Sequence, residues 1–546
     1  MPDAAPVRTY ADLHEHLDRL DRAGLLYRID APVNKDTEMH PLVRWQFRGG
    51  IAERDRKAFL FTNIVDGNGR RYDLPMVIGA YAGTAEIYRI GMNVATLADI
   101  GPAWERAIAH PVPPREVTVA PCHEVVVTGA ALDGAGQGLA SLPIPISTPG
   151  FDAAPYLTAT GVITRDPDSG VQNLGTYRGM LKAPTRLGMM MLANIRAGGL
   201  EHWRKYRARG EPMPVAIVVG CPPLVAFQGP QKLRLDLDEL AVAGGLAGSP
   251  INVVRGRTVD LLVPAEAELV IEGRVDTDYL EPEGPFGESH GYVALEDYNT
   301  VVNVTAITRR RGAVLTSILS QVTPSESSVV KRLAYEPMFL AHLRDQLGVK
   351  NIRRVVLHEA LTNLRRFVFL QFAPFTPREE VWRALRGTIT LQAAIGKFVV
   401  AIDEDIDPFN ADAVFWAMGY RCNPVTDTHV VPYREAGHGP RTAGEQATES
   451  AMLIDATMKH AMPPVALPKR EFMENAKALW ERLGLPALRP EAPWFGYSLG
   501  DWTETWDANA MQATRGEWAL RSESYRQRRR GDIAPNTPVR AVEDEE

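Results

Sequence analysis

Two changes in local sequence pattern limit what this chain can fold into. From about residue 115 to 312, short apolar and β-branched runs such as Val215–Val219 and Val301–Ile307 alternate with turns rich in Gly and Pro. Many short strands separated by such turns are typical of a barrel or a sandwich. From about residue 313, runs such as Phe367–Phe372 alternate with helical patterns, which predicts βαβ units and a mostly parallel sheet.

The two ends of the chain differ from these parts. Near the N-terminus, Leu13, Leu17 and Leu20 recur at helical spacing and Gly24 follows them as a helix-ending residue, within an α/β region. After about residue 469 the chain is rich in tryptophan and finishes in charged runs. This pattern predicts a helical arm that packs on a partner or on another domain, followed by a disordered tail.

We therefore expect an α/β (α+β) multi-domain protein with four parts. They are an N-terminal α/β region at 1–114, a β-rich domain at 115–312, a C-terminal α/β domain at 313–468, and a helical arm with a disordered tail at 469–546. Within the β-rich domain, one helix is expected at about 184–208.

Composition excludes several classes of protein. The net charge of −7 argues against general nucleic-acid binding, which needs a basic face. There is no apolar run of about 18 residues, so no membrane span is expected. Cys122, Cys221 and Cys422 lie far apart without a CxxC pair, so neither a disulfide framework nor a cysteine zinc site is expected. Because no secretory signal is visible, the sequence predicts a cytoplasmic protein.

The segment Pro282–Glu288, of sequence PEGPFGE, places two acids on a stiff, non-helical backbone. Its prolines fix their own φ and favour extended geometry in the preceding residue. Glu283 and Glu288 are thereby held near each other, and two neighbouring carboxylates do not both ionise easily. Such a pair can provide a carboxylic acid for proton transfer near neutral pH.

Three other segments carry polar groups of interest. Gln172–Arg178 combines an amide, a hydroxyl and an arginine, the side chain best suited to carboxylate or phosphate. Asp238–Gly245 has acids at a helix start, and Gly396–Phe398 has a lysine entering a buried strand. Amide, carboxylate and phosphate oxygens suit Mg²⁺ or Mn²⁺. Each segment alone also fits a structural role: a turn, a helix-start acid or a lysine at a strand end.

Together and in this order, these segments resemble the UbiD family of decarboxylases, which use prenylated FMN. The resemblance runs from about residue 8 to about residue 500. It is carried by Ser141–Pro145, Ala154–Thr158, Asn173–Arg178, Glu239–Gly244, Pro282–Glu288 with His290–Tyr292, Gly396–Asp407 and Ile454–Thr457. It implies that the β-rich domain is a split β-barrel, like that of flavin reductases, which binds prenylated FMN.

The resemblance also implies catalytic roles. Arg178, Glu283 and Glu288 match the Glu-Arg-Glu network of the family. Glu288 would deliver a proton to the carbon that CO₂ leaves. Arg178 would bridge the two carboxylates and orient the substrate carboxylate, and Glu283 would hold Arg178.

For the metal, the resemblance implies two ligands and leaves the third open. Asn173 and Glu239 match ligands of Mn²⁺ or Mg²⁺, which anchors the cofactor phosphate with K⁺ nearby. The family commonly has a histidine shortly after the NxGxYR segment, but Leu187–Gly199 contains none. Asn194 is the nearest candidate by side-chain chemistry, and Arg196 is its rival by spacing. An arginine could contact the phosphate but could not bind the metal.

For the flavin itself, the resemblance implies a set of contacts from two parts of the chain. Lys397 matches a lysine that contacts the phosphate. The backbone near Thr176, Tyr177 and Arg178, together with that of Ser320–Thr323, would line the flavin.

A physical argument supports the need for such a cofactor. Loss of CO₂ from an aromatic or α,β-unsaturated acid leaves an sp² carbanion that no protein side chain can stabilise, so an electron-accepting cofactor is required. We expect non-oxidative, reversible decarboxylation of an aromatic or heteroaromatic acid. Met189–Met191 could line an adaptable substrate pocket, or they could be core residues.

Two other functions remain open. One is an FMN-dependent oxidoreductase of the split-barrel type, and the other is a subunit of a carboxylase complex that needs a catalytic partner. The expected partners are a small aromatic acid, CO₂, a flavin prenyltransferase that supplies the cofactor, and further copies of the chain in a homodimer or homohexamer. Neither a nucleic acid nor a membrane is expected.

Overall fold

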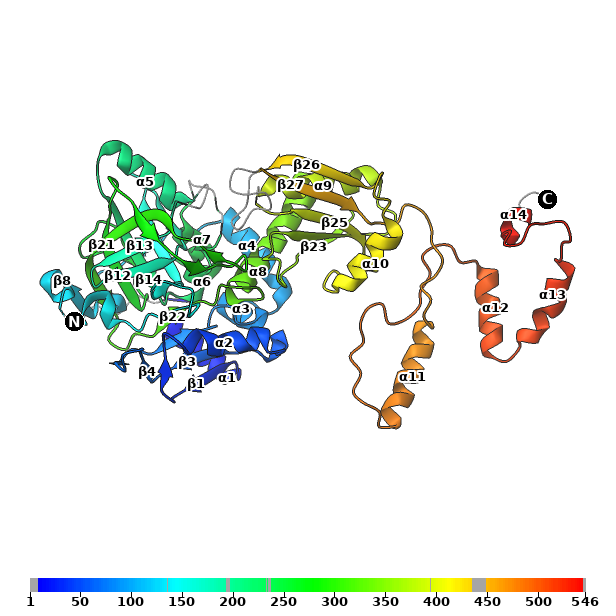
Figure 1. Ribbon diagram of the computed structural model, residues 1–546, viewed down its shortest axis with the longest axis horizontal. Coiled ribbons are helices and arrows are strands. Elements are labelled where there is room, and N and C mark those ends of the chain that lie inside the picture. Colours follow the sequence, from blue (N-terminus) through cyan, green and yellow to red (C-terminus); the bar gives the residue numbers. More distant parts are fainter. Residues whose placement is uncertain are drawn as a thin grey trace. The chain divides into compact units, whose positions relative to one another are not determined.

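The structure is a computed structural model that describes residues 8–134, 136–192, 197–231, 233, 237–392, 394–434 and 448–543 (Figure 1). The chain forms two compact units. The first unit consists of Met1–Ala401 and Asn423–Asp455, and the second consists of Ile402–Cys422 and Ala456–Glu546. In the described part, no helix combines the length and the apolar character needed to cross a bilayer.

The first unit begins with a small α/β layer. A four-stranded sheet has the order β1 (Leu26–Ile29), β3 (Ala58–Phe61), β6 (Met76–Ile78), β22 (Leu315–Ser317), so its last strand comes from far along the chain. A second sheet contains β2 (Val33–Asn34), β4 (Ile64–Val65) and β5 (Arg71–Tyr72). The helices are α1 (Leu13–Arg22), α2 (Met39–Arg48), α3 (Ala85–Met92) and α4 (Ile100–Ala109). The helix predicted around Leu13–Leu20 is confirmed.

A ten-stranded antiparallel sheet forms the centre of the first unit. Its strands are β8 (Val125–Thr128), β9 (Tyr156–Leu157), β10 (Thr160–Arg165), β11 (Gln172–Gly175), β12 (Gly179–Ala183), β13 (Arg186–Met189), β14 (Met213–Val219), β17 (Leu269–Val275), β18 (Glu281–Glu283) and β21 (Asp297–Arg309). The main order, β11-β10-β14-β17-β21-β13-β12-β9, is an open path among the described residues. The split barrel implied by the family resemblance therefore stays a prediction.

Smaller elements surround this sheet. They are β7 (Arg115–Glu116), β15 (Asn252–Arg255) and β16 (Leu262–Pro264) in one sheet, the pair β19 (Phe286–Gly287) and β20 (Val293–Ala294), and the helices α5 (Gly198–Arg209), α6 (Pro223–Ala226) and α7 (Glu239–Ala247). Helix α5 packs on β10, β11 and β14.

Strand β14 separates two hydrophobic cores. Met213, Val215, Ile217 and Val219 lie in one core, and the alternate residues Ala216 and Val218 lie in the other. Successive side chains of a strand point to opposite faces of a sheet, so a strand covered on both faces is apolar throughout.

The helix predicted at about 184–208 is wrong at its start. Arg186–Met189 form strand β13, and helix α5 begins only at Gly198. Leu187, Met189 and Met191 are fully buried in one core, at every second position. Burial at every second position is the pattern of a strand. It cannot be recognised in the sequence, because the consecutive methionines Met189–Met191 show no alternation of apolar and polar residues.

The C-terminal part of the first unit contains a five-stranded sheet. Its order is β23 (Ile352–Leu357), β24 (Phe367–Phe372), β25 (Phe398–Asp403), β27 (Glu449–Asp455), β26 (Thr428–Arg434). Helices α8 (Glu326–Ala341) and α9 (Arg378–Leu391) pack against this sheet. The predicted mostly parallel sheet is wrong, because β25 and β27 pair in parallel whereas β23–β24 and β26–β27 are antiparallel. The chain returns directly from β23 to β24 without a crossover helix, so these two neighbours must run in opposite directions.

The second unit contains α10 (Ala411–Arg421), α11 (Arg470–Arg482), α12 (Glu504–Thr514), α13 (Ser522–Gln527) and α14 (Val539–Glu543). Two acids at the end of β25 and just after it, Asp403 and Asp405, pair with an arginine of this unit. Asp403 accepts a hydrogen bond from Arg421 Nη1 at 2.9 Å, and Asp405 accepts one from Arg421 Nη2 at 2.7 Å. These acids therefore neutralise a buried arginine inside the protein.

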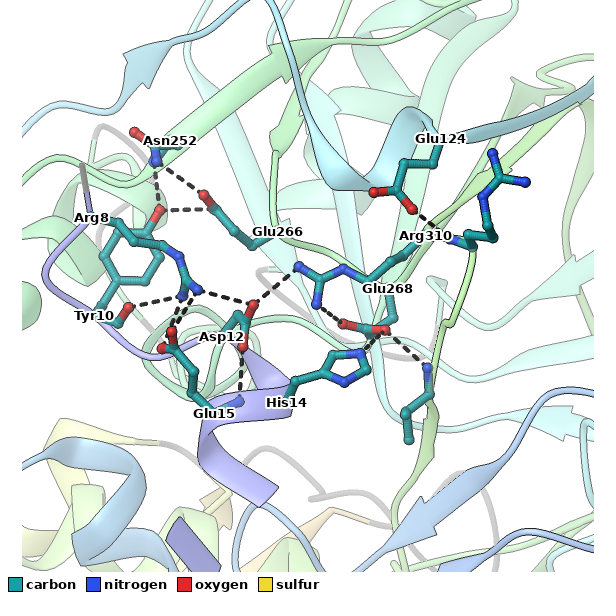
Figure 2. A network of polar contacts seen from close by, with 12 residues as sticks. Arg8, Tyr10, Asp12, His14, Glu15, Glu124, Asn252, Glu266, Glu268 and Arg310 are labelled. Atoms are coloured by element: carbon teal, nitrogen blue, oxygen red, sulfur yellow. Dashed lines mark hydrogen bonds and ion pairs between the residues drawn. The ribbon is translucent and has the colours of Figure 1, made fainter. Parts of the chain in front are cut away.

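A polar network joins helix α1 to the central sheet (Figure 2). Asp12 caps α1 by accepting a hydrogen bond from the Glu15 backbone N–H at 2.9 Å. Arg310 donates to Asp12 at 3.0 Å and lies 3.3 Å from Glu268, a buried acid directly before β17. His14 contacts the same Glu268 at 3.0 Å, so one buried carboxylate anchors the first helix.

Candidate functional site

One large cavity in the first unit is lined by segments that lie far apart in the sequence. Its empty volume is about 1330 Å³, part of it open to solvent. The β11 end and the residues that follow it contribute Asn173 through Arg178, and α7 contributes Glu239. The PEGPFGE segment contributes Phe286 and Glu288. A cavity of this size with a few converging polar groups is typical of a ligand site.

Arg178 holds both acids of the PEGPFGE segment. Its Nε and Nη2 donate to the two carboxylate oxygens of Glu283, each at 2.8 Å. Its Nη1 donates to Glu288. Glu283 is completely buried, and Glu288 is 9% exposed and lines the cavity. The two acids therefore differ: Glu283 is enclosed and bound by a two-point contact, whereas Glu288 faces the cavity.

Aromatic packing fixes this arrangement from the other side. The guanidinium carbon of Arg178 lies 4.8 Å from the centroid of the Phe286 ring, a cation–π contact. The Phe286 and Tyr156 rings lie 4.4 Å apart. Burial and the charge of Glu283 raise the pKa of the Tyr156 hydroxyl, which therefore stays protonated. Each planar group is thus held against another, and the arginine has little freedom to turn.

The charge state of Arg178 is secure. Burial alone would lower the pKa of this guanidinium, but the hydrogen bonds to Glu283 and the charge of Glu288 outweigh that effect and raise it. The site therefore holds a permanent cation beside an acid that reaches the cavity.

Asn173 and Glu239 form a second polar group in the same cavity. Glu239 is the first residue of α7 and accepts a hydrogen bond from the Leu174 backbone N–H at 2.9 Å. Burial raises the pKa of Glu239 to about 8, because the hydrogen bonds from the backbone N–H groups of Leu174 and of Glu239 itself do not compensate for the loss of water. The Asn173 Nδ2 atom is buried without a hydrogen-bond partner in the described structure. Both side chains are therefore suited to bind a ligand in the cavity.

Gly198, at the start of α5, leaves room for Asn173. A Cβ atom at position 198 would lie 1.9 Å from Asn173 Oδ1. The absence of a side chain there is therefore required for the observed position of the amide.

A divalent cation fits this donor set in part. An amide oxygen and a carboxylate are ligands that Mn²⁺ and Mg²⁺ prefer, and a cation would compensate for the buried charge of Glu239. Among the described residues, no group of three His, Cys, Asp or Glu could hold a metal ion. The predicted third ligand, Asn194, and its rival Arg196 lie outside the described residues.

Comparisons with known proteins identify the family of this chain. Residues 115–322 match the family model described as the 3-octaprenyl-4-hydroxybenzoate carboxy-lyase Rift-related domain, and residues 329–456 match the C-terminal domain of the same family. The chain belongs to the UbiD family. The enzyme class that the sequence resemblance implied, a carboxy-lyase, is thereby confirmed.

Relatives of this UbiD protein extend over nearly its whole length. The uncharacterised protein sll0936 from Synechocystis sp. is 28% identical over 517 residues, which are 90% of this chain and 96% of the relative. The UbiD-class enzyme HmfF from Pelotomaculum thermopropionicum, in complex with FMN, is 28% identical with a TM-score of 0.73 over 86% of this chain and 100% of that one. An evolved dimeric form of HmfF in complex with prFMN is 29% identical. Its TM-score is 0.69, over 82% of this chain and 95% of that one.

A more distant structure shows the fold alone. The closed form of vanillic acid decarboxylase from Sedimentibacter hydroxybenzoicus is 24% identical, with a TM-score of 0.71 over 88% of this chain and 100% of that one. The mixed α/β multi-domain class predicted from the sequence is therefore confirmed.

The other residues predicted for the flavin site of this UbiD protein divide into two groups. Thr176, Tyr177 and Ser320 line the cavity. Lys397, predicted to contact a phosphate, is not among the lining residues, and its Nζ donates to Glu449 at 2.8 Å. Of the three methionines, Met190 lines the cavity, whereas Met189 and Met191 are core residues.

Two cationic side chains of the cavity were missed by the sequence analysis. Lys331 comes from α8, and Arg365 comes from the segment between β23 and β24. Ser327, Lys331 and Tyr335 all line the cavity, and their spacing of four residues is a pattern in the sequence that could have identified this face of the helix.

Proposed function

We propose that this UbiD-family enzyme decarboxylates an aromatic or heteroaromatic acid without net oxidation, using prenylated FMN bound in the cavity. The observation that carries the proposal is the two-point contact between Arg178 and Glu283, with Glu288 on the cavity side of the same guanidinium. HmfF, a structural relative with 28% identity in its FMN complex and 29% in the prFMN complex of its evolved dimeric form, supports a flavin cofactor for this chain. When bound, the modified flavin supplies the electron sink that the departure of CO₂ requires.

The residues of the chain would then act as follows. Arg178 orients the substrate carboxylate and keeps its charge throughout. Glu283 fixes Arg178 and is too enclosed to reach the substrate. Glu288 carries the proton to the carbon that CO₂ leaves, because its carboxylate faces the cavity. Positioned acids of this kind contribute roughly 10²–10⁴-fold to a rate.

Asn173 and Glu239 would hold a divalent cation, Mn²⁺ or Mg²⁺, that anchors the flavin phosphate, with K⁺ nearby. The buried amide and the carboxylate with its raised pKa support this assignment. We expect the central domain, residues 115–312, to curve as a split barrel around the flavin. A flavin prenyltransferase would supply the cofactor, and the enzyme would assemble as a homodimer or homohexamer.

The test is a panel of aromatic and heteroaromatic acids offered to enzyme co-expressed with a flavin prenyltransferase. We expect CO₂ release from at least one acid, and none from enzyme that holds plain FMN.

A Glu288→Gln variant should lose roughly 10²–10⁴-fold in kcat and retain its affinity for FMN. Full turnover by that variant would contradict the role of Glu288. Oxidation of NAD(P)H with plain FMN, without CO₂ release, would instead favour the split-barrel oxidoreductase.

A further inference from the structure

The loop before β9, residues 147–153, contacts the PEGPFGE segment of the cavity wall. We propose that Asp152 in this loop is a positioning residue, which fixes the Gly287 peptide and thereby the place of Glu288 in the cavity. The inference rests on the proposed function, because Glu288 is the proton donor there. It adds a residue that lies outside the cavity lining to the Glu283–Arg178–Glu288 network.

Asp152 binds three backbone N–H groups with its two carboxylate oxygens. Its Oδ1 accepts a hydrogen bond from the Gly287 N–H at 2.8 Å. Its Oδ2 accepts from the N–H groups of Ser147 at 3.1 Å and of Thr148 at 2.7 Å. Hydrogen bonds to an ionised group are roughly twice as strong as those between neutral groups. One oxygen therefore shapes the loop itself, and the other joins the loop to the PEGPFGE segment, 135 residues further along the chain.

The part of the chain that holds Gly287 also holds the two residues before it. The Ala153 N–H donates a hydrogen bond to the Pro285 carbonyl at 3.1 Å. Tyr156, the first residue of β9, packs its ring on that of Phe286, with the ring centroids 4.4 Å apart. Three consecutive residues that lead to the proton donor are therefore fastened to one short stretch of the chain.

A second side chain holds Gly287 as well. The Gln321 Nε2 donates to the Gly287 carbonyl at 3.4 Å, and the Gln321 Oε1 accepts from Arg44 Nη2 at 2.7 Å. This carbonyl belongs to the peptide that links Gly287 to Glu288. A Cβ atom at position 287 would lie 2.1 Å from Thr148 Oγ1, so the backbone here has no room for a side chain. A shift of Gly287 therefore disturbs contacts with two separate parts of the chain.

The place of Gly287 sets the place of the Glu288 carboxylate. The Glu288 side chain leaves the backbone at the next residue, and its oxygens accept from Arg178 Nη1 and from the Ser289 N–H. A group that transfers a proton must come within roughly 2.6–3.2 Å of the atom that exchanges it. A displacement of about 1 Å can cost roughly 10²-fold in rate. The contact made by Asp152 therefore affects kcat, although Asp152 does not line the cavity.

Asp152→Asn tests this contact with little change in shape. An amide accepts with one oxygen and donates with its NH₂ group, whereas a carboxylate accepts with both oxygens. In either orientation the NH₂ group faces a backbone N–H, so either Gly287 or the loop loses its acceptor. The assay uses the full-length enzyme co-expressed with a flavin prenyltransferase and an acid that the parent decarboxylates. We expect kcat to fall roughly 10–100-fold and KM to stay within about twofold, because the contacts of the substrate itself are unchanged.

A measurement of proton transfer separates positioning from general damage. Because a misplaced donor slows the proton transfer, the ratio of kcat in H₂O to kcat in D₂O should rise above that of the parent. The affinity for FMN, followed by flavin fluorescence, should match that of the parent. Gln321→Met removes the other side-chain contact to Gly287 and should give the same combination of results, which keeps the test decisive if Asp152→Asn folds poorly.

Asp66→Asn is the matched control. Asp66 also accepts hydrogen bonds from two backbone N–H groups of its own loop, those of Asn68 and Arg70, each at 2.9 Å. It lies between β4 and β5 and does not line the cavity. This variant should lower the urea midpoint of unfolding as Asp152→Asn does, and it should keep the kcat and the isotope ratio of the parent.

The results that would overturn the inference differ in what else they affect. An unchanged kcat in Asp152→Asn would remove the role of Asp152 and leave the proposed function intact. A lower kcat with an isotope ratio no higher than that of the parent, or an equal loss of kcat in Asp66→Asn, would do the same, because the damage would then be general. A parent protein that releases CO₂ from none of the acids would remove the proposed function, and the role of Asp152 with it.

Discussion

Arg178 contacts its two acidic neighbours in different ways. Two of its nitrogens hold the fully buried Glu283, whereas a third nitrogen donates to Glu288 at the wall of the cavity. A carboxylate held at both oxygens by one guanidinium is fixed in position by two parallel charge-assisted hydrogen bonds. In the proposed mechanism, Glu283 therefore fixes the arginine, and Glu288 transfers the proton.

Glu283→Gln should damage the protein as well as the reaction. Removing one partner of a buried ion pair costs about 3–5 kcal/mol, because the remaining charge keeps its burial without its partner. We expect a lower free energy of unfolding in urea and a loss of kcat. Glu281→Gln is the matched control, since Glu281 lies two residues earlier but is 25% exposed and pairs with Lys182 and Arg186. The control should cost about 1 kcal/mol or less, and equal losses in the two variants would contradict the special position of Glu283.

The sequence was informative about those site residues that sit in short, rigid motifs. Asn173 and Arg178 share one strand end, and the prolines around Glu283 and Glu288 restrict where both acids can point. Lys331 and Arg365 could not be found in this way. They lie on a helix and a loop that meet the cavity only through the tertiary fold, which a local pattern does not encode.

At the scale of elements, the attachment of helix α1 depends on a titrating side chain. His14 contacts the buried Glu268, which also accepts a hydrogen bond from the Val314 N–H at 2.9 Å and faces Arg310. The hydrogen bond to Glu268 raises the pKa of His14, while burial and Arg310 oppose it and Asp12 assists it. The protonated histidine thus forms an ion pair that its neutral form lacks.

This contact predicts a pH dependence of stability. Because the pKa of His14 is higher in the folded state, its stabilising effect is complete below the unfolded pKa of roughly 6.5 and disappears as pH rises through the folded value. We expect the melting temperature of His14→Gln to fall furthest below that of the parent near pH 6, and the difference to shrink toward pH 8. His460→Gln is the control at an exposed histidine. A difference that grows with pH would contradict the ion pair.

Helices and strands were predicted correctly where the apolar residues fit only one spacing, and wrongly where they fit both the helix and the strand spacing. The leucines of α1 fit only a helix, and that prediction is confirmed. The stretch around Met189–Met191 fits both periods, because unbranched apolar side chains suit a helix while its burial alternates as in a strand. Strand direction in the five-stranded sheet depends on pairing partners that are distant in sequence, so a βαβ rhythm alone did not show that the sheet is mixed.

At the scale of the whole molecule, the C-terminal helices lack a buried face. None of the residues in α11, α12 or α13 is buried, and Trp518 and Leu520 are 70% and 72% exposed. Large apolar side chains on a helical arm are suited to contact with another protein surface. Packing of the tryptophan-rich arm on a partner or on another domain therefore stays a prediction.

Removal of residues 517–546 should therefore change the assembly of the protein without changing its cavity. We expect the molar mass from light scattering to fall to that of a smaller oligomer or a monomer, and FMN affinity to stay within twofold, because every residue lining the cavity belongs to the first unit. Removal of residues 528–546 is the control, since it spares Trp518, Leu520 and Tyr525. An unchanged mass in the longer truncation would exclude these residues from the assembly interface.

The interleaving of the two units has a consequence for how the protein is made. Residues 402–422 belong to the second unit but leave the ribosome before 423–455, which complete the first unit. Domains commonly fold during synthesis, beginning with the N-terminal one. The first unit can therefore close as soon as residue 455 has emerged, while Arg421 and its two aspartates wait for the C-terminal residues around Met458 that complete their surroundings. Synthesis that stops early would yield a finished cavity attached to an unfinished second unit.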